Sequence, residues 1–134
     1  MKASLLDTDI LSEFLRGNQK VVSKVDSSLK EFGEINISVI TYYEILNGLL
    51  YKDAKKQLKK FIAFAELCNI LPLTRQAAET AAEIQATLRK KGKEIGHTDT
   101  LIAGIAISNN LQLITNNTAH FNRIKNLELA NWLK

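Results

Sequence analysis

Short apolar runs alternate with longer amphipathic segments along the chain. In the longer segments apolar residues return every three or four positions, which is typical of a helix that packs on one side. Residues 53–67 and 74–91 show this period clearly, with polar residues on the opposite side. Between such segments, short runs rich in Ile, Leu and Val predict strands at residues 3–6, 35–39, 69–73, 111–115 and 127–131.

The segment 100–108 lacks this one-sided pattern. Its residues, "TLIAGIAIS", are apolar almost all the way round, which is typical of a helix packed between a sheet and another element. Gly104 in this segment and Gly48 in an earlier one carry a cost in helix propensity. Close packing between helices is the usual reason for such glycines, so we expect it at both positions.

The alternation of runs and segments predicts an α/β fold. No two apolar runs are joined by a tight two-residue turn, so the strands should lie parallel with helices on both faces. We expect a three-layer α/β/α sandwich with a central parallel sheet of four to five strands. The chain has a single proline, no low-complexity tract and no repeat, so residues 1–134 are predicted to form one domain.

Polar residues stand where the predicted strands end. Asp7 follows the first run, Glu44 lies in the helix after the second, Asp99 begins the apolar helix, and "TNN" at 115–117 follows the fourth run. Ligands of parallel sheets bind beyond the carboxyl ends of the strands, so these side chains are expected to share one crevice. Several carboxylates held close together need a cation among them. One Cys and two His cannot build a zinc cage, so Mg²⁺ or Mn²⁺ is expected.

Three stretches carry a family resemblance: "LLDTDIL", "SVITYYEILNG" and "GHTDTLIAGIAISNNLQLITNNTAHFNRIKNLELANW". With their spacing they resemble the PIN-domain ribonucleases, and among these the VapC-type toxins of bacterial toxin–antitoxin pairs. The resemblance covers essentially the whole chain. It implies a PIN-like fold and a Mg²⁺-dependent endoribonuclease that inhibits translation or growth. In such an enzyme Asp7, Glu44 and Asp99 hold the metal, and a metal-activated water attacks the RNA phosphodiester. Mn²⁺ is expected to substitute for Mg²⁺.

The resemblance is incomplete at one ligand position. Relatives often carry a fourth acidic residue two positions after the threonine, and this chain has Asn117 there. An amide oxygen can still ligate Mg²⁺, so Asn117 is expected to complete the metal set and, with Thr115, the catalytic set. Spacing does not decide whether Asn116 or Asn117 points inward. Thr8 and Thr115 are expected to donate hydrogen bonds to the metal's waters or to a phosphate oxygen.

The family also implies partners. These are an RNA substrate, a cognate VapB-type antitoxin and a second copy in a homodimer, with a higher toxin–antitoxin assembly left open. Two other hypotheses stay open: a non-catalytic RNA-binding or scaffold PIN domain, and an RNA-processing nuclease that is no toxin. The RNA target, its cleavage sequence, the antitoxin class and the number of metal ions are not decided by the sequence.

The charge balance fits an RNA partner without requiring one. Lys and Arg number 18 against 14 Asp and Glu, for a formal charge of +4. The lysine clusters at 52–60 and 89–93 are typical of solvated helix faces as well as of RNA contacts. Cys68 is alone, no secretory pattern opens the chain, and no apolar run approaches the ~20 residues that cross a bilayer. We therefore expect a soluble, cytoplasmic protein with no membrane partner.

Several polar residues have plainer interpretations. Asp9 is expected to cap the first helix rather than to ligate a metal. His97 and His120 could serve as acid and base of a metal-independent ribonuclease, but that hypothesis leaves the acids unexplained. We expect His97 at the rim of the crevice and His120 on a surface turn beside a buried Phe121. The "DTD" stretch also prompts a haloacid-dehalogenase-type phosphatase, whose Asp-x-Asp-x-Thr motif needs threonine where this chain has Leu11.

Overall fold

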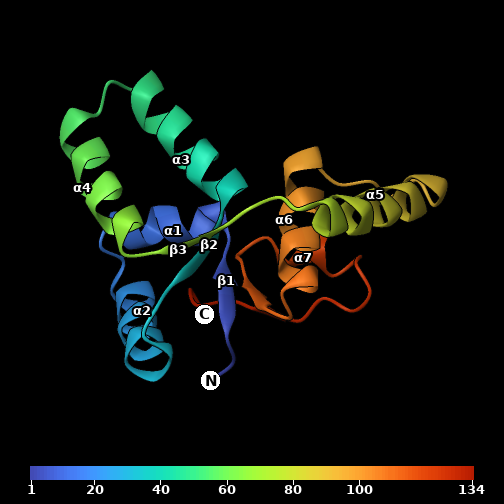
Figure 1. Ribbon diagram of the computed structural model, residues 1–134, viewed down its shortest axis with the longest axis horizontal. Helices are drawn as coiled ribbons and strands as arrows, with labels where there is room; N and C mark the ends of the chain where they lie inside the picture. Colours follow the sequence, from blue (N-terminus) through green and yellow to red (C-terminus); the bar gives the residue numbers. More distant parts are fainter.

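A five-stranded sheet runs through the middle of the molecule (Figure 1). The structure is a computed structural model that describes residues 1–134. All neighbouring strands are parallel, in the order β3-β2-β1-β4-β5. The five predicted strands are confirmed, and each is shorter than its apolar run because only part of the run joins the ladder. Their bounds are β1 Ser4–Leu6, β2 Asn36–Ser38, β3 Asn69–Leu71, β4 Gln112–Ile114 and β5 Leu129–Ala130.

Helices cover both faces of the sheet, which confirms the three-layer α/β/α prediction. The buried side chains of the first four helices pack together on one face, and those of the last three pack on the other. In Figure 1 helices α3 and α4 form an arm above one side of the sheet, and α5 extends on the opposite side. No helix is long and apolar enough to span a membrane. The helices are α1 Thr8–Leu15, α2 Gln19–Phe32, α3 Val39–Tyr51, α4 Lys55–Glu66, α5 Arg75–Lys90, α6 His97–Ser108 and α7 Thr118–Phe121.

Strand β1 contributes to both layers. Successive side chains of a strand point to opposite faces of the sheet. Leu5 packs with the α5 and α6 side, Leu6 packs with the α1 to α4 side, and both are almost fully buried. Leu113 and Ile114 of the neighbouring β4 pair with them in register and divide between the faces in the same way. Two consecutive leucines therefore serve two cores, as expected for a strand that is buried on both faces.

Helix α2 is an element that the sequence analysis does not predict. Its local signals are nevertheless ordinary. The side chain of Asn18 accepts hydrogen bonds from the first turn, and Gly33 ends the helix with a φ of 76°. Val21 and Val25 lie one helical turn apart and are buried. The other positions are mostly polar, so the apolar stripe is narrow and the period is easily missed.

The two helical glycines differ in their surroundings. A Cβ added at Gly104 would collide with the backbone carbonyl of Ala77 on α5 and would lie 3.0 Å from the Cβ of Ala81. The prediction of close packing is therefore confirmed for Gly104. For Gly48 it is wrong, because a Cβ there would meet no atom within 4 Å.

Candidate active site

The predicted polar residues lie at the carboxyl edge of the sheet, where the strand order reverses. The chain leaves β1 toward β2 on one side and returns to β4 on the other, so the end of β1 is the topological switch point. Asp7 directly follows β1, and its backbone N–H donates to the carbonyl of Ile114 over 2.9 Å. Thr115 directly follows β4 and is fully buried. The two residues therefore face each other across the central pair of strands.

Asp7 is a buried carboxylate with both oxygens engaged. Oδ1 accepts the backbone N–H of Thr8 over 2.8 Å and caps helix α1, while Oδ2 accepts the hydroxyl of Thr115 over 2.8 Å. Only 5% of the residue is exposed. Burial and then the charge of Asp9 raise the pKa of Asp7 to about 7, and the two hydrogen bonds oppose this only in part. Each oxygen keeps a second lone pair for a further ligand.

A chain of hydroxyl groups links the β1–α1 junction to helix α3. The hydroxyl of Thr8 donates to Oε1 of Glu44 over 2.7 Å. Its oxygen lies 3.0 Å from the hydroxyl of Thr41, which is fully buried. Thr8 has a single hydroxyl hydrogen, so Thr41 donates to Thr8 and Thr8 donates to Glu44. Thr8 thus orients Glu44, a role different from the expected contact with metal-bound water.

Thr41 is a site-supporting residue that the sequence analysis does not single out. It lies three positions before Glu44, and residues three apart share one side of a helix. That spacing is the signal that could have identified it.

Asp99 joins the same group of acids from the first turn of α6. Burial raises its pKa, the charges of Glu44 and Asp9 raise it further, and His120 lowers it. Asp99 in turn raises the pKa of Asp7. Charge effects fall off with distance, so Asp99 lies near Glu44 and Asp7, and the hydroxyl of Thr8, the residue after Asp7, holds Glu44 at the same edge of the sheet.

Asp9 belongs to this group as a fourth acid, and the expectation that it caps α1 is wrong. The helix begins at Thr8, so the cap falls to Asp7. The carboxylate of Asp9 instead crosses to the segment after β4, where Oδ2 accepts the backbone N–H of Asn116 over 3.0 Å. Its Oδ1 is buried without any hydrogen-bond partner, and burial raises its pKa. A buried oxygen without a partner costs free energy unless a ligand satisfies it.

The two asparagines after Thr115 point in different directions. The side-chain oxygen of Asn116 accepts from the amide of Asn131 over 2.9 Å, and the residue is exposed. Asn117 donates its backbone N–H to the hydroxyl of Thr115, and its amide nitrogen lies 3.0 Å from Nδ1 of His120. Asn116 meets the acids through its backbone N–H, which donates to Asp9, and Asn117 meets them through Thr115, whose hydroxyl donates to Asp7.

The two histidines are placed differently from each other. His120 lies exposed in the single-turn helix α7 beside the fully buried Phe121, close to the predicted surface turn, and it is near enough to Asp99 to lower its pKa. His97 is exposed at the start of α6 and lines a groove between α5 and α6 together with Arg89 and Leu101, while its expected place at the rim of the crevice stays a prediction.

The donor set fits a hard divalent cation. Its members are carboxylate, amide and hydroxyl oxygens, and one carboxylate oxygen, Oδ1 of Asp9, is buried and unsatisfied. The pKa values of three neighbouring aspartates are raised, which means that their charged forms are disfavoured at this site. A bound cation would stabilise the charged forms and lower these pKa values. No three His, Cys, Asp or Glu side chains are arranged so that they could hold a metal ion together, so the fit is one of ligand chemistry.

Comparison with known proteins assigns the fold to a family. Residues 4–127 match the PIN domain. The chain belongs to the PIN-domain family. The PIN domain described here is similar to Ribonuclease VapC1 of Haemophilus influenzae, with 30% identity over 97% of this chain and 98% of that protein. It is also similar to a tRNA(fMet)-specific endonuclease VapC of Shigella flexneri, with 31% identity over 75% of this chain and 76% of the other.

Solved structures agree with this assignment. The PIN domain superposes on a chain of VapBC2 from Rickettsia felis, a complex bound to a DNA fragment from its promoter, with a TM-score of 0.88 and 30% identity. The superposition covers 97% of this chain and 98% of the other. The sequence resemblance to VapC-type PIN domains is therefore confirmed.

Proposed function

We propose that this VapC-type PIN-domain protein is a Mg²⁺-dependent endoribonuclease and the toxin of a toxin–antitoxin pair. The observation that carries the proposal is the convergence of Asp7, Glu44 and Asp99 at the switch point of the sheet, with Asp9 as a fourth acid. Relatives named as ribonucleases at about 30% identity support the class of reaction.

The roles of the side chains follow from their hydrogen bonds. Asp7, Asp99 and the amide oxygen of Asn117 would hold the metal ion. Thr115 connects two of them, because its hydroxyl donates to Asp7 and accepts the backbone N–H of Asn117. When bound, Mg²⁺ supplies a water of lowered pKa and positive charge opposite the scissile phosphate, and Mn²⁺ can replace it. Glu44 is held through Oε1 by Thr8, while Oε2 makes no hydrogen bond and is available to orient the attacking water and take its proton.

Cleavage of RNA by the purified protein tests this proposal. Wild-type protein with Mg²⁺ should cleave RNA, EDTA should stop cleavage, and Asp7→Asn should lower the rate by about 10²–10³ or more, as loss of a charge-stabilising group does. Asp26→Asn is the matched control, because Asp26 is exposed on α2 and makes no ion pair. Equal cleavage by Asp7→Asn and wild type, or cleavage that persists in EDTA, would overturn the proposal. Sequencing of the 5′ ends formed with and without Glu44 identifies the target.

A partner protein is the second part of the proposal. Large apolar side chains are exposed along the arm formed by α3 and α4, with Tyr51 90% exposed and Leu67 76% exposed. Exposed apolar patches of this kind mark protein interaction sites, and VapBC complexes are among the similar structures. We assign this arm to a VapB-type antitoxin, and expect the chain to form a homodimer. Expression of the chain alone should arrest growth, and co-expression with the small protein encoded beside it should restore growth. Continued growth without the small protein indicates an RNA-processing nuclease that is no toxin.

Asn117 is the specific observation that favours a second candidate, a non-catalytic RNA-binding PIN domain. An amide in place of a fourth carboxylate removes one negative charge from the metal set. Isothermal titration with Mn²⁺ separates the two candidates. Binding that disappears in Asp99→Asn supports the enzyme, whereas RNA binding without Mn²⁺ binding supports the alternative.

A further inference from the structure

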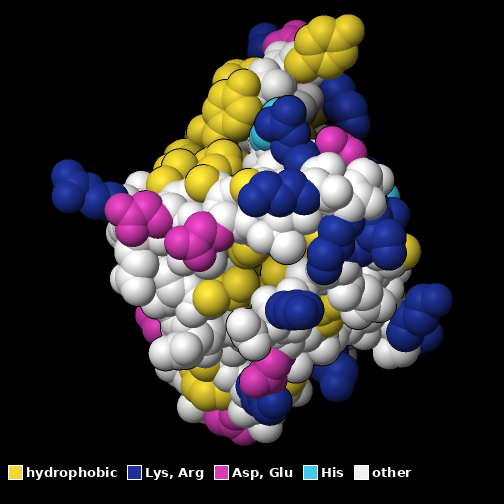
Figure 2. Space-filling model, turned by 90° about the vertical axis from the view of Figure 1, so that its right-hand side faces the viewer, with side chains coloured by type: hydrophobic (Ala, Val, Ile, Leu, Met, Phe, Trp, Pro, Cys, Tyr) yellow, Lys and Arg dark blue, Asp and Glu magenta, His cyan; other side chains and the backbone are white.

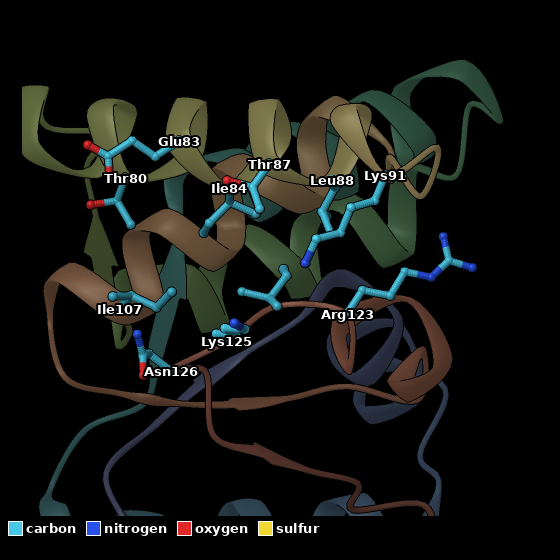
Figure 3. A pocket seen from close by; sticks show the side chains of 11 residues that line it. Thr80, Glu83, Ile84, Thr87, Leu88, Lys91, Ile107, Arg123, Lys125 and Asn126 are labelled. Atoms are coloured by element: carbon cyan, nitrogen blue, oxygen red, sulfur yellow. The ribbon is translucent and has the colours of Figure 1, made fainter.

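A cavity of about 270 Å³ lies outside the acidic site, between α5, the end of α6 and the segment that follows α7 (Figure 3). Its floor is aliphatic. Ile84 and Leu88 come from α5, Ile107 comes from the last turn of α6, and Ile124 follows α7. The volume lies just below the ~300–1,000 Å³ of most small-molecule sites, which suits a unit as small as one nucleoside.

The rim of this cavity is basic. Lys91, Arg123 and Lys125 line it together with a single acid, Glu83. None of the three cations forms an ion pair, so their charge is available to an anion. Figure 3 shows the side chain of Lys91 reaching down from α5 into the space between the helix and the segment below. In the same view Arg123 extends beyond one end of the cavity, and its Nη1 donates to the carbonyl of Lys93 over 3.3 Å.

Hydrogen-bonding groups complete the lining. Thr80, Thr87 and Asn126 also line the cavity, and their side chains make no hydrogen bond within the protein. An apolar floor, free hydroxyl and amide groups and a cationic rim are the three features that recognise a base, a ribose and a phosphate in turn.

A basic residue links the cavity to the loop before α6. Arg123 lies in the segment that follows α7 and lines the cavity. The hydrogen bond from Arg123 to Lys93 ties this segment to the loop that leads into α6 and Asp99. Figure 2 views the molecule from the α5 side, and Lys and Arg side chains predominate over Asp and Glu on this face. A polyanion that reaches Asp99 therefore meets positive charge in the direction of the cavity.

We propose that this cavity binds one nucleotide of the RNA strand that extends from the acidic site, with the base against the aliphatic floor and the phosphate against Lys91 and Lys125. Only the identity of the ligand of this subsite, an RNA nucleotide, rests on the proposed ribonuclease function. It gives the enzyme a contact with unpaired RNA at a distance from the scissile bond.

A titration with mononucleotides tests the subsite directly. The amide resonances of Thr87, Lys91 and Asn126 in ¹⁵N-labelled protein should shift saturably when UMP or AMP is added in the presence of EDTA. This readout depends neither on cleavage nor on a metal ion. Absence of shifts at these residues overturns the proposal, and so do shifts confined to Asp7 and its neighbours.

RNA affinity provides the second test, with charge-matched controls. The Thr87→Glu substitution adds a carboxylate at the mouth of the cavity, and Gln57→Glu adds one at an exposed position of α4. Fluorescence anisotropy with a short labelled oligouridylate should show a loss of about tenfold or more for Thr87→Glu and little change for Gln57→Glu. Equal losses would mean that only bulk charge matters, and would overturn the proposal. Circular dichroism confirms that both variants are folded.

The salt dependence of binding identifies the phosphate contacts. Replacing Lys91 and Lys125 together by Gln should lower the slope of log affinity against log salt by about 0.7, since the two lysines share one phosphate and each phosphate contact with a single strand contributes about 0.7. Replacing the exposed Lys55 and Lys59 of α4 should leave the slope unchanged. If the slope is unchanged in both double variants, the assignment of the phosphate to Lys91 and Lys125 is rejected.

The subsite and the catalytic site can be tested separately. If Asp7→Asn abolishes cleavage and keeps the resonance shifts caused by UMP, nucleotide binding in the cavity does not depend on the chemistry at the acids. Either proposal can therefore fail without the other.

Discussion

Replacing Asp7 by asparagine should make the metal-free protein more stable while it removes the proposed activity. Asparagine keeps the shape of the side chain. Its oxygen can accept the N–H of Thr8, and its amide nitrogen can donate to the hydroxyl oxygen of Thr115, whose own hydrogen then loses the acceptor that it has in wild type. The substitution therefore removes a buried charge and keeps two hydrogen bonds to residue 7, and it leaves one hydroxyl hydrogen unpaired. Sites that gather like charges for function commonly gain stability when a charge is removed.

The magnitude follows from the protonation of the folded and unfolded chains. Burial, and then Asp9, raise the pKa of Asp7 from 3.8 to about 7. Between these two values the folded protein holds a proton that the unfolded chain has released, so stability falls as the pH rises through this window and is constant above it. The loss amounts to about 4 kcal/mol at pH 8 and about 2 kcal/mol at pH 5. Neutral hydrogen bonds are weaker than those to a carboxylate, so we expect Asp7→Asn to gain about 3 kcal/mol at pH 8 and about 1 kcal/mol at pH 5.

Urea unfolding in EDTA, followed by circular dichroism, measures this difference. Wild type, Asp7→Asn and the exposed control Asp26→Asn are compared at pH 8 and pH 5. The control should match wild type at both pH values, and Mg²⁺ should stabilise wild type more than Asp7→Asn. A variant that unfolds at the same or a lower urea concentration than wild type at pH 8 refutes the argument. A gain of equal size at both pH values refutes its electrostatic cause.

Three further predictions concern orientation, packing and metal affinity. Thr8→Val removes the hydroxyl that donates to Glu44, the proposed general base, and leaves the buried hydroxyl of Thr41 without its partner. Cleavage should therefore fall about 10–100-fold, equivalent to a charge-assisted bond of ~1.5–3 kcal/mol; equal rates for variant and wild type would remove Thr8 from the site. Gly104→Ala should lower the free energy of unfolding by about 1–3 kcal/mol because the added carbon meets the backbone of α5, whereas Gly48→Ala should raise it by about 0.5–1 kcal/mol; urea titrations check both signs. Asn117→Asp should lower the Mg²⁺ concentration for half-maximal cleavage several-fold, and Asn116→Asp should leave it unchanged; equal shifts would show that both asparagines border the metal.

The layers of the fold and the region of the site follow from local features of the chain. The run "ASLL" ends in two consecutive leucines, so it predicts a strand buried on both faces, and helical periods in the segments between the runs predict the covering layers. Parallel strands place all their carboxyl ends at one edge, so residues that follow β1, β2 and β4 must converge whatever their separation along the chain. For this reason the sequence suffices to select Asp7, Glu44, Asp99 and Thr115 as neighbours.

The roles of individual side chains depend on tertiary contacts that no local pattern contains. Asp9 looks like a helix cap because it precedes "ILSEFL", yet its hydrogen bond goes to Asn116, 107 positions away. The side-chain oxygen of Asn116 accepts a hydrogen bond from Asn131, which lies beyond β5, so a tertiary contact and not the spacing decides where that amide points.

Differences in packing between similar residues also arise from tertiary contacts. Gly48 and Gly104 have the same helix propensity, and they differ only because α5 passes close to one of them. His97 and Asp99 lie two residues apart on α6, yet one lines the groove against α5 and the other is close enough to Glu44 for that charge to raise its pKa. Sequence periodicity predicts which face of an element is buried, because that depends on neighbours within a turn or two. The partner of a given atom depends on how distant segments meet, and only the assembled fold specifies that geometry.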